Sequence, residues 1–305
     1  MILLLDFKPV TLEDNRILTP ILSKFGGKSC QHSFASMTGL FDKYGDEFVI
    51  EDGVLIVHRA KRDHDGYRVY LAPIGDTYGS EAKFLDMILE DAHSYGAKVS
   101  FETVTEDFRE RVANLLPDFE VIEDRDYAEY IYSVEKMSVL PGHALAAKRN
   151  RVRAFYSAYE DHIRIENISP GNMDDVRAFQ DKWISERKKS DDDPMLETEN
   201  NAIGTYFDNF DALGFKGIVV YVYGSVVGYA AGVALSDDTM DEVIEKGLPE
   251  ITGIYQLLCN EFALICCKGY EYVNREEDIG LEGLRRAKMS YQPEILLSKY
   301  IMREQ

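Results

Sequence analysis

A stretch near the C-terminus gathers most of the side chains that could carry out chemistry. It runs from Asn274 to Pro293 and is rich in carboxylates, cations and glycines. Asp278 could cap a helix that begins at Ile279, which would account for an acid at that position. Gly280 and Gly283 need another reason, because a glycine inside a helix costs about 1 kcal/mol relative to alanine. Since such glycines usually allow close packing or the approach of a ligand, we expect part of this stretch to line a site.

A second candidate is the pair Glu245 and Lys246, at the end of a strand that precedes a long helix. A glutamate in a partly desolvated cleft can have its pKa raised toward neutrality and then act as general base for an amine or hydroxyl nucleophile. Lys246, Arg275 or Lys288 could stabilise the oxyanion of a tetrahedral intermediate. The alternative interpretation is a surface ion pair, worth less than about 1 kcal/mol.

Further residues are predicted to position a substrate. They lie in the C-terminal stretch or in a basic run within a predicted helix: Asn274, Glu276, Asp278, Gly280, Gly283 and Tyr291 in the first, and Lys148, Arg149 and Asn150 in the second. The basic run could bind phosphates, as the acceptor stem of a tRNA would require. A solvated helix face is an equally good account of it.

Length and charge limit the classes of function. With 305 residues the chain is expected to form about two domains, and its 45% hydrophobic and 29% charged residues are typical of a globular protein. The formal charge of −20 disfavours general nucleic-acid binding and attracts cations or zwitterions. No histidine spacing suggests a metal site, and none is predicted.

Cysteines and apolar runs indicate the compartment. Cys259, Cys266 and Cys267 lie in an apolar stretch that is expected to form one buried helix, so we interpret them, with Cys30, as reduced core residues. The apolar run at positions 2–5 is too short for a signal sequence or a membrane span. A cytoplasmic protein without a membrane span is therefore expected.

Hydrophobic periodicity predicts two successive sets of strands and helices. The first set has strands at 48–50 and 54–57, which Asp52 and Gly53 are expected to join as a hairpin, then a strand at 67–71, a helix at 82–95, a strand at 98–102, a helix at 105–116, and strands at 119–122 and 127–133. The second has helix 144–159, strand 163–168, helices 173–188 and 199–213, strands 218–223, 226–235 and 240–246, helix 251–267, strand 272–274, helix 279–288 and strand 294–301. This order predicts an α+β protein of two similar halves, 1–143 and 144–305, each a mixed sheet with helices on its faces.

The motifs also carry a family resemblance. The stretch from Asn274 to Pro293, together with Tyr130 to Ser133, Leu140 to Gly142 and Lys148 to Asn150, resembles the bacterial family named after the C-terminal domain of phosphatidylglycerol lysyltransferase. The segment that begins at Glu245 and Lys246 is similar to the same family. The resemblance implies two GNAT-like (acyl-CoA N-acyltransferase-like) halves in tandem, as in lysylphosphatidylglycerol synthases and Fem-type aminoacyltransferases. The membrane-embedded half of the lysyltransferases has no counterpart in this sequence, which weakens the expectation of a lipid acceptor.

The resemblance also bears on the donor. In GNAT proteins the pyrophosphate of an acyl-CoA rests on backbone N–H groups where the helix after the fourth strand begins. The corresponding segment runs from Glu250 to Tyr255, and it has a carboxylate in place of a cation or amide and a bulky ring where the backbone should be open. An acyl-CoA donor is therefore less expected than an aminoacyl-tRNA.

Three functions follow from these observations. The first is an acyl- or aminoacyl-transferase that takes an aminoacyl group from a charged tRNA to a small-molecule amine or hydroxyl acceptor. The alternative is a non-catalytic sensor that binds a small amino compound, which the acidic composition favours. An acetyl-CoA-dependent N-acetyltransferase is the third.

Overall fold

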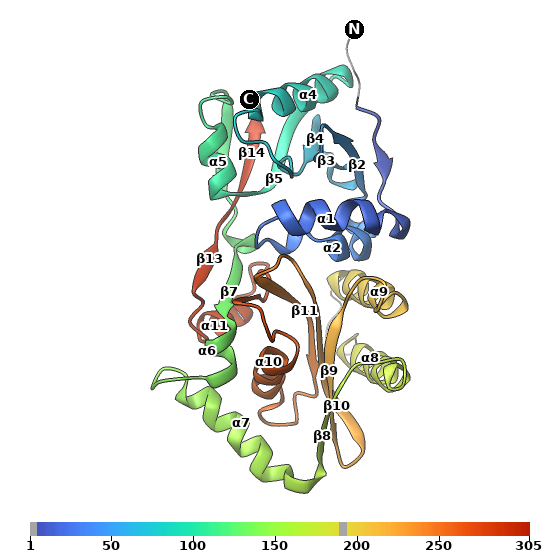
Figure 1. Cartoon of the computed structure of the whole chain (residues 1–305), viewed down its shortest axis with the longest axis vertical. Coiled ribbons are helices and arrows are strands. Elements are labelled where there is room, and N and C mark those ends of the chain that lie inside the picture. Colours follow the sequence, from blue (N-terminus) through green and yellow to red (C-terminus); the bar gives the residue numbers. More distant parts are fainter. Residues whose placement is uncertain (1–4, 189–193) are drawn as a thin grey trace. The chain divides into compact units, whose positions relative to one another are not determined.

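A computed structural model describes residues 5–188 and 194–305 (Figure 1). Its strands form two 7-stranded sheets with helices packed on them, so the predicted α+β class is confirmed. The chain divides into two compact units. The first contains the described residues up to Glu129, Glu277–Glu282 and Leu296–Gln305, and the second contains Tyr130–Glu276 and Gly283–Ile295.

The sheet of the first unit has the strand order β1-β2-β3-β4-β5-β14-β6. Its strands are β1 (Lys8–Pro9), β2 (Asp46–Glu51), β3 (Val54–Arg59), β4 (Tyr67–Tyr70), β5 (Lys98–Thr105), β6 (Phe119–Glu123) and β14 (Lys299–Glu304). The predicted hairpin is confirmed, because β2 and β3 pair antiparallel around Asp52 and Gly53, which both have positive φ. Strands β4 and β5 are parallel, and such a pair requires a long crossover connection, usually a helix.

That connection is α4 (Glu81–Ser94), whose buried stripe of Phe84, Leu85 and Ile88 belongs to the core of this unit. The other helices are α1 (Asn15–Phe25), α2 (Phe34–Gly39), α3 (Phe41–Tyr44) and α5 (Glu106–Val112). The first three of these were not predicted. In α1 the interior Pro20 argues against a helix by local rules, although buried Leu18 and Leu22 hold it in place.

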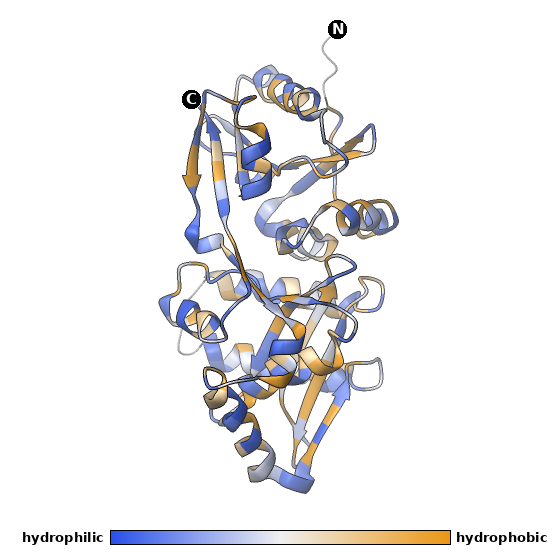
Figure 2. Cartoon of the chain, turned by 60° about the vertical axis from the view of Figure 1, so that its left-hand side comes forward, coloured by the Kyte–Doolittle hydropathy of each residue, from blue (hydrophilic) through white to orange (hydrophobic). Residues whose placement is uncertain are grey.

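The sheet of the second unit has the order β13-β7-β12-β11-β10-β9-β8. Its strands are β7 (Glu129–Ser133), β8 (Ile163–Asn167), β9 (Lys216–Val222), β10 (Ser225–Ala234), β11 (Thr239–Gly247), β12 (Tyr272–Asn274) and β13 (Ile295–Leu297). Strands β11 and β12 are parallel, and the helix that joins them is α10 (Ile254–Ile265). Strands β9 and β10 are mostly buried and apolar, and Figure 2 shows hydrophobic, orange stretches along strands of this sheet.

Helices cover both faces of this second sheet. On one face lie α8 (Met173–Lys188) and α9 (Pro194–Asp208), and on the other lies α10 (Figure 1). Helices α6 (Val134–Val139) and α7 (Ala146–Tyr159) pack against α10, and α11 (Glu282–Met289) follows β12. All four cysteines are free and buried, as predicted.

The two units do not coincide with the expected halves 1–143 and 144–305. Strand β7 enters the second sheet beside β12, and β14 returns to the first sheet between β5 and β6. Backbone pairing between distant segments decides where these strands lie, and hydrophobic periodicity does not contain that information.

Candidate functional site

A β-bulge in β11 sets the direction of its acidic side chains. In the ladder with β10, Glu242 and Val243 both lie opposite the single residue Gly232. Two residues against one define a bulge. In a regular strand the side chains of Glu242 and Glu245 would point to opposite faces of the sheet. The bulge instead places both carboxylates beside Arg275.

Five side chains form what we call the Arg275 cluster: Glu242, Glu245, Cys259, Arg275 and Tyr291. Arg275 Nε lies 2.5 Å from Glu242 Oε2, and Arg275 Nη2 lies 2.6 Å from Glu245 Oε2. The Cys259 thiol donates to Glu245 Oε2 at 3.0 Å. The Glu245 side chain is 16% exposed and that of Glu242 only 2%. Glu245 is therefore the carboxylate of the pair that an external molecule can reach more readily.

Burial controls protonation in this cluster. It raises the pKa of Glu242 to about 8, against the opposing effect of Arg275 and with a further increase from the negative charge of Glu245. Burial also raises the pKa of the Cys259 thiol well above its usual range, so Cys259 remains a donor at neutral pH. The two carboxyl groups therefore share one guanidinium, and Glu242 is mostly protonated near neutral pH.

This raised pKa makes the stability depend on pH. Folding raises the pKa of Glu242 from its ordinary value of 4.5 to about 8, so the folded protein binds more protons between these values and loses stability as pH rises through 8. We expect E242Q to remove this loss, which is at most about 1.4 kcal/mol per pH unit. Urea unfolding at pH 5, 7 and 9 measures it, with the exposed Glu250→Gln as control. Parallel profiles for E242Q and wild type would contradict the prediction.

Lys288 stabilises the backbone of Arg275 at the cluster. Its Nζ donates to the carbonyl oxygen of Arg275 at 2.6 Å, and Tyr132 Oη donates to the carbonyl oxygen of Lys288 at 2.8 Å. These bonds fix the backbone at Arg275. Lys288 is therefore placed to position Arg275, whereas the sequence suggested an oxyanion stabiliser.

Tyr291 lies between two cations. Lys148 Nζ is 4.3 Å from the centroid of its ring, and Arg275 Cζ is 5.5 Å from it. Burial lowers the pKa of Lys148, and the charges of Arg151 and Arg275 lower it further. The structure thus brings two residues that the sequence singled out separately, Lys148 and Tyr291, to the same cluster.

Lys246 lies away from this cluster. Its Nζ pairs with Glu199 Oε1 at 2.7 Å and lies 4.3 Å from the Trp183 ring centroid, on the face covered by α8 and α9. Neighbouring residues of a strand point to opposite faces. The expected cooperation of Lys246 with Glu245 is therefore not seen.

Three other predicted residues are not part of the Arg275 cluster. Asn274 is buried, and its side-chain oxygen accepts from the backbone N–H of Glu276 at 2.7 Å. Glu276, two residues after the end of β12, has a φ of 56°. Gly283 is exposed within α11, and a Cβ there would meet no atom of the described residues within 4 Å. The close packing that was one of the two reasons expected for Gly283 is thus not present, and the space beside it is open.

Asp278 and Gly280 belong to the first unit, and Asp278 does not cap α11, which begins at Glu282. Asp278 accepts from Gly280 N at 3.0 Å and from Arg125 Nη1 at 3.2 Å. A Cβ at Gly280, whose φ is 78°, would lie 2.9 Å from an Asp126 carboxylate oxygen. The glycine is needed for a tight turn within the protein.

The basic run on α7 is partly occupied by internal contacts. Arg149 donates to the carbonyl oxygens of Leu140 and Gly142. Asn150 is exposed, as are Arg151 and Arg153. Of the predicted residues of this run, Asn150 therefore faces solvent, whereas Arg149 is held by internal contacts.

The segment that would hold an acyl-CoA pyrophosphate does not fit that group. A Cβ at Gly253, just ahead of α10, would lie 3.0 Å from the carbonyl oxygen of Arg151 and 3.5 Å from Phe155 Cβ. Helix α7 therefore packs against this glycine. Tyr255 Oη and Trp183 Nε1 both donate to the carbonyl oxygen of Gly247 at the start of the same loop.

Sequence reasoning missed Glu242, Cys259 and Tyr132. One signal was available, because a glycine inside a strand often marks a bulge or a close backbone approach. Gly232 is such a residue: a Cβ there would lie 1.8 Å from the carbonyl oxygen of Asp241. The bulge, and with it the orientation of Glu242, could have been suspected from that position.

Within 5–188 and 194–305, no group of three or more His, Cys, Asp or Glu side chains is arranged to hold a metal ion. In the same part of the chain, no helix combines the length and the apolar character needed to cross a membrane.

Comparisons with known proteins agree with this architecture. Residues 24–303 match the family described as "Phosphatidylglycerol lysyltransferase, C-terminal". A crystal structure of a conserved protein of unknown function from Bacteroides thetaiotaomicron VPI-5482 is 30% identical, with a TM-score of 0.92 over 99% of this chain and 100% of that one. The structure of L-PGS from Bacillus licheniformis is 17% identical, with a TM-score of 0.66 over 95% and 92% of the two chains.

Two further similarities are more distant. A tandem GNAT protein from the clavulanic acid biosynthesis pathway has a TM-score of 0.50 at 10% identity, over 98% of each chain, and the predicted tandem GNAT-like fold is confirmed. A curated, uncharacterised protein of Mycoplasmoides gallisepticum is 22% identical over 186 residues. That match spans 61% of this chain and 59% of the relative.

Proposed function

Since this chain belongs to the family of phosphatidylglycerol lysyltransferase C-terminal domains, we propose that it transfers an aminoacyl group to an amine or hydroxyl acceptor at the Arg275 cluster. The family supports a function of the aminoacyltransferase type. The observation that carries the proposal is the partly exposed Glu245 carboxylate, held by Arg275 at 2.6 Å and by Cys259 at 3.0 Å.

In the proposed reaction Glu245 is the general base. It takes the proton of the acceptor N–H or O–H while the acceptor atom attacks the ester carbonyl of the donor. A new bond forms between the carbonyl carbon and the acceptor, and the bond to the ribose oxygen of the tRNA breaks. The proton returns to that ribose oxygen. Arg275 and Cys259 orient the carboxylate, and Lys288 holds the backbone of Arg275.

An aminoacyl-tRNA is the donor that we propose, and it would place the reaction in the cytoplasm. The packing of α7 against Gly253 disfavours an acyl-CoA. Exposed Arg151 and Arg153 on α7 offer positive charge for phosphates on an otherwise acidic protein.

The proposal is tested with radiolabelled aminoacyl-tRNAs, prepared with a mixture of amino acids, and a set of acceptors. The acceptors are phosphatidylglycerol vesicles, a lysine-containing peptide and glycinamide. We expect a labelled product with one of them, and an about 100-fold lower rate for Glu245→Gln, because the loss of a general base typically has that effect. The matched control is Glu250→Gln, an exposed glutamate beyond the end of β11. Equal rates for Glu245→Gln and wild type would contradict the role of Glu245.

One observation favours a second function. Both carboxylates of the cluster already pair with Arg275, so the cluster is internally compensated in the absence of a reactant. A non-catalytic protein that binds a small amino compound would have no need of a free base. Calorimetry that detects saturable binding of an amino compound, with no turnover of any aminoacyl-tRNA, would favour this function over transfer.

A further inference from the structure

The first unit contains a small cavity that none of the Arg275 cluster residues lines. Its volume of about 30 Å³ has room for roughly two water-sized groups. It is lined by Tyr44, Arg59, Arg62, Glu102, Thr103, Asp124, Tyr127 and Ile301. Tyr44, Arg59 and Thr103 are buried and form what we call its floor, whereas Arg62, Asp124 and Tyr127 are partly exposed and form its mouth.

A second β-bulge shapes the floor. In the ladder between β5 and β14, Glu102 and Thr103 lie opposite Ile301 alone. Thr103 adopts a φ of 54°, which is unfavourable for a β-branched residue. Strained backbone of this kind persists where the surrounding structure imposes it, and it is concentrated at functional sites.

Two hydroxyl groups of the floor have no partner. Among residues 5–188 and 194–305, neither Tyr44 Oη nor Thr103 Oγ1 has a hydrogen-bond partner, although the two residues are 3% and 6% exposed. Buried polar groups are nearly always satisfied, and an exception calls for a ligand or water. Each hydroxyl can both donate and accept, so both are able to accept hydrogen bonds from a donor such as an ammonium group.

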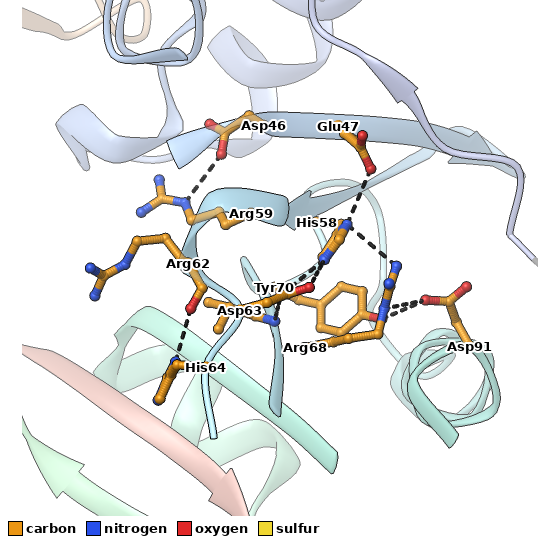
Figure 3. Close-up of polar contacts among 11 residues, drawn as sticks. Asp46, Glu47, His58, Arg59, Arg62, Asp63, His64, Arg68, Tyr70 and Asp91 are labelled. Atoms are coloured by element: carbon orange, nitrogen blue, oxygen red, sulfur yellow. Dashed lines mark hydrogen bonds and ion pairs between the residues drawn. The ribbon is translucent and has the colours of Figure 1, made fainter. Parts of the chain in front are cut away.

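Both arginines that line the cavity form ion pairs, and one lining carboxylate is not part of these pairs. Arg59 Nε lies 3.5 Å from Asp46 Oδ1, and Figure 3 marks this contact by a dashed line. Arg59 Nη2 also donates to Gln31 Oε1. Arg62 makes two bonds to Glu102, at 3.1 and 3.0 Å. Among the lining residues that the structure describes, the charge of Asp124 remains after these pairings. Burial raises the pKa of Asp124, and the negative charges of Asp126 and Glu102 raise it further.

We propose that this cavity binds the ammonium end of a small primary amine. The ammonium would donate to Tyr44 Oη, Thr103 Oγ1 and the carboxylate of Asp124, and the ring of Tyr127 would lie beside it at the mouth. An anion would instead face the carboxylate of Asp124, which no lining arginine compensates. A methylammonium ion has two non-hydrogen atoms, which is the size that the cavity accepts. The inference does not rest on the transferase proposal, because it uses residues of the first unit alone.

Calorimetric titration of the full chain with methylammonium chloride tests this proposal. Tetramethylammonium chloride and sodium acetate serve as probes of size and charge at equal ionic strength. We expect saturable binding of methylammonium only, because tetramethylammonium has no N–H donor and exceeds the cavity. Saturable binding of acetate or equal binding of all three probes would overturn the proposal. So would the absence of methylammonium binding at millimolar concentration, up to a 100-fold excess over protein.

Two variants locate the binding. Asp124→Asn is expected to weaken methylammonium binding at least about tenfold, whereas Asp118→Asn, an exposed aspartate with the same change of charge, leaves it unchanged. Tyr44→Phe is expected to weaken binding without lowering the stability of the ligand-free protein, because its hydroxyl has no partner to lose. Unchanged affinity in a folded Asp124→Asn, verified by circular dichroism, would also overturn the proposal.

Discussion

Arg275→Met is expected to destabilise the protein by about 3–5 kcal/mol at pH 8. Arg275 is the cation that compensates Glu242 and Glu245, and its side chain is only 12% exposed. Removing it leaves two neighbouring carboxyl groups in a low-dielectric environment. The cost comes from the uncompensated buried charge, since the methionine itself fills much of the same volume.

The loss should depend on pH in a defined direction. Glu242, whose pKa is raised to about 8, is mostly protonated at pH 5, so less charge is left uncompensated there. Urea unfolding of Arg275→Met and wild type at pH 5 and pH 8 measures the difference. The control is Arg153→Met, which removes an exposed arginine of α7 and should change stability by less than about 0.5 kcal/mol. A destabilisation no larger at pH 8 than at pH 5 would contradict the electrostatic explanation.

The predictable part of the fold is the part that local patterns encode. The Asp-Gly turn of the β2–β3 hairpin, the apolar stripe of α4 and the strand at 272–274 were all predicted, because each is decided by residues close together in the chain. Helix α1, with its interior Pro20, was not. The return of β14 to the first sheet was also beyond local reasoning, because that strand pairs with β5, which lies far earlier in the chain.

The candidate site was predictable to a smaller extent. The acidic and basic residue types near Glu245 and Arg275 were recognised, and these two side chains do meet at 2.6 Å. Strand alternation separates Lys246 from Glu245, and that could have been deduced from the sequence. The contribution of Glu242 could not, because it depends on a one-residue irregularity in β11. A bulge of this kind reverses the direction of every later side chain in the strand.

The bulge itself leads to the second large effect, which we expect from Gly232→Ala. A Cβ at this position would lie 1.8 Å from the carbonyl oxygen of Asp241 and 2.9 Å from Phe262 Cζ. The first contact is with backbone, so no change of side-chain rotamer relieves it. We expect a loss of about 3 kcal/mol or more in the free energy of unfolding, since β10 and β11 must separate locally.

The same substitution should also affect the proposed reaction. If β11 loses its bulge, Glu242 and Glu245 no longer point to the same face, and Arg275 can pair with only one of them. Transfer by the folded fraction should therefore fall along with stability. Gly204→Ala is the matched control: Gly204 lies inside α9 with no atom of the described residues within 4 Å of its Cβ position, so alanine is expected to stabilise by about 0.5–1 kcal/mol. A Gly232→Ala protein with wild-type stability and an intact Glu242–Arg275 pair would show that the close approach at Gly232 is not what maintains the bulge.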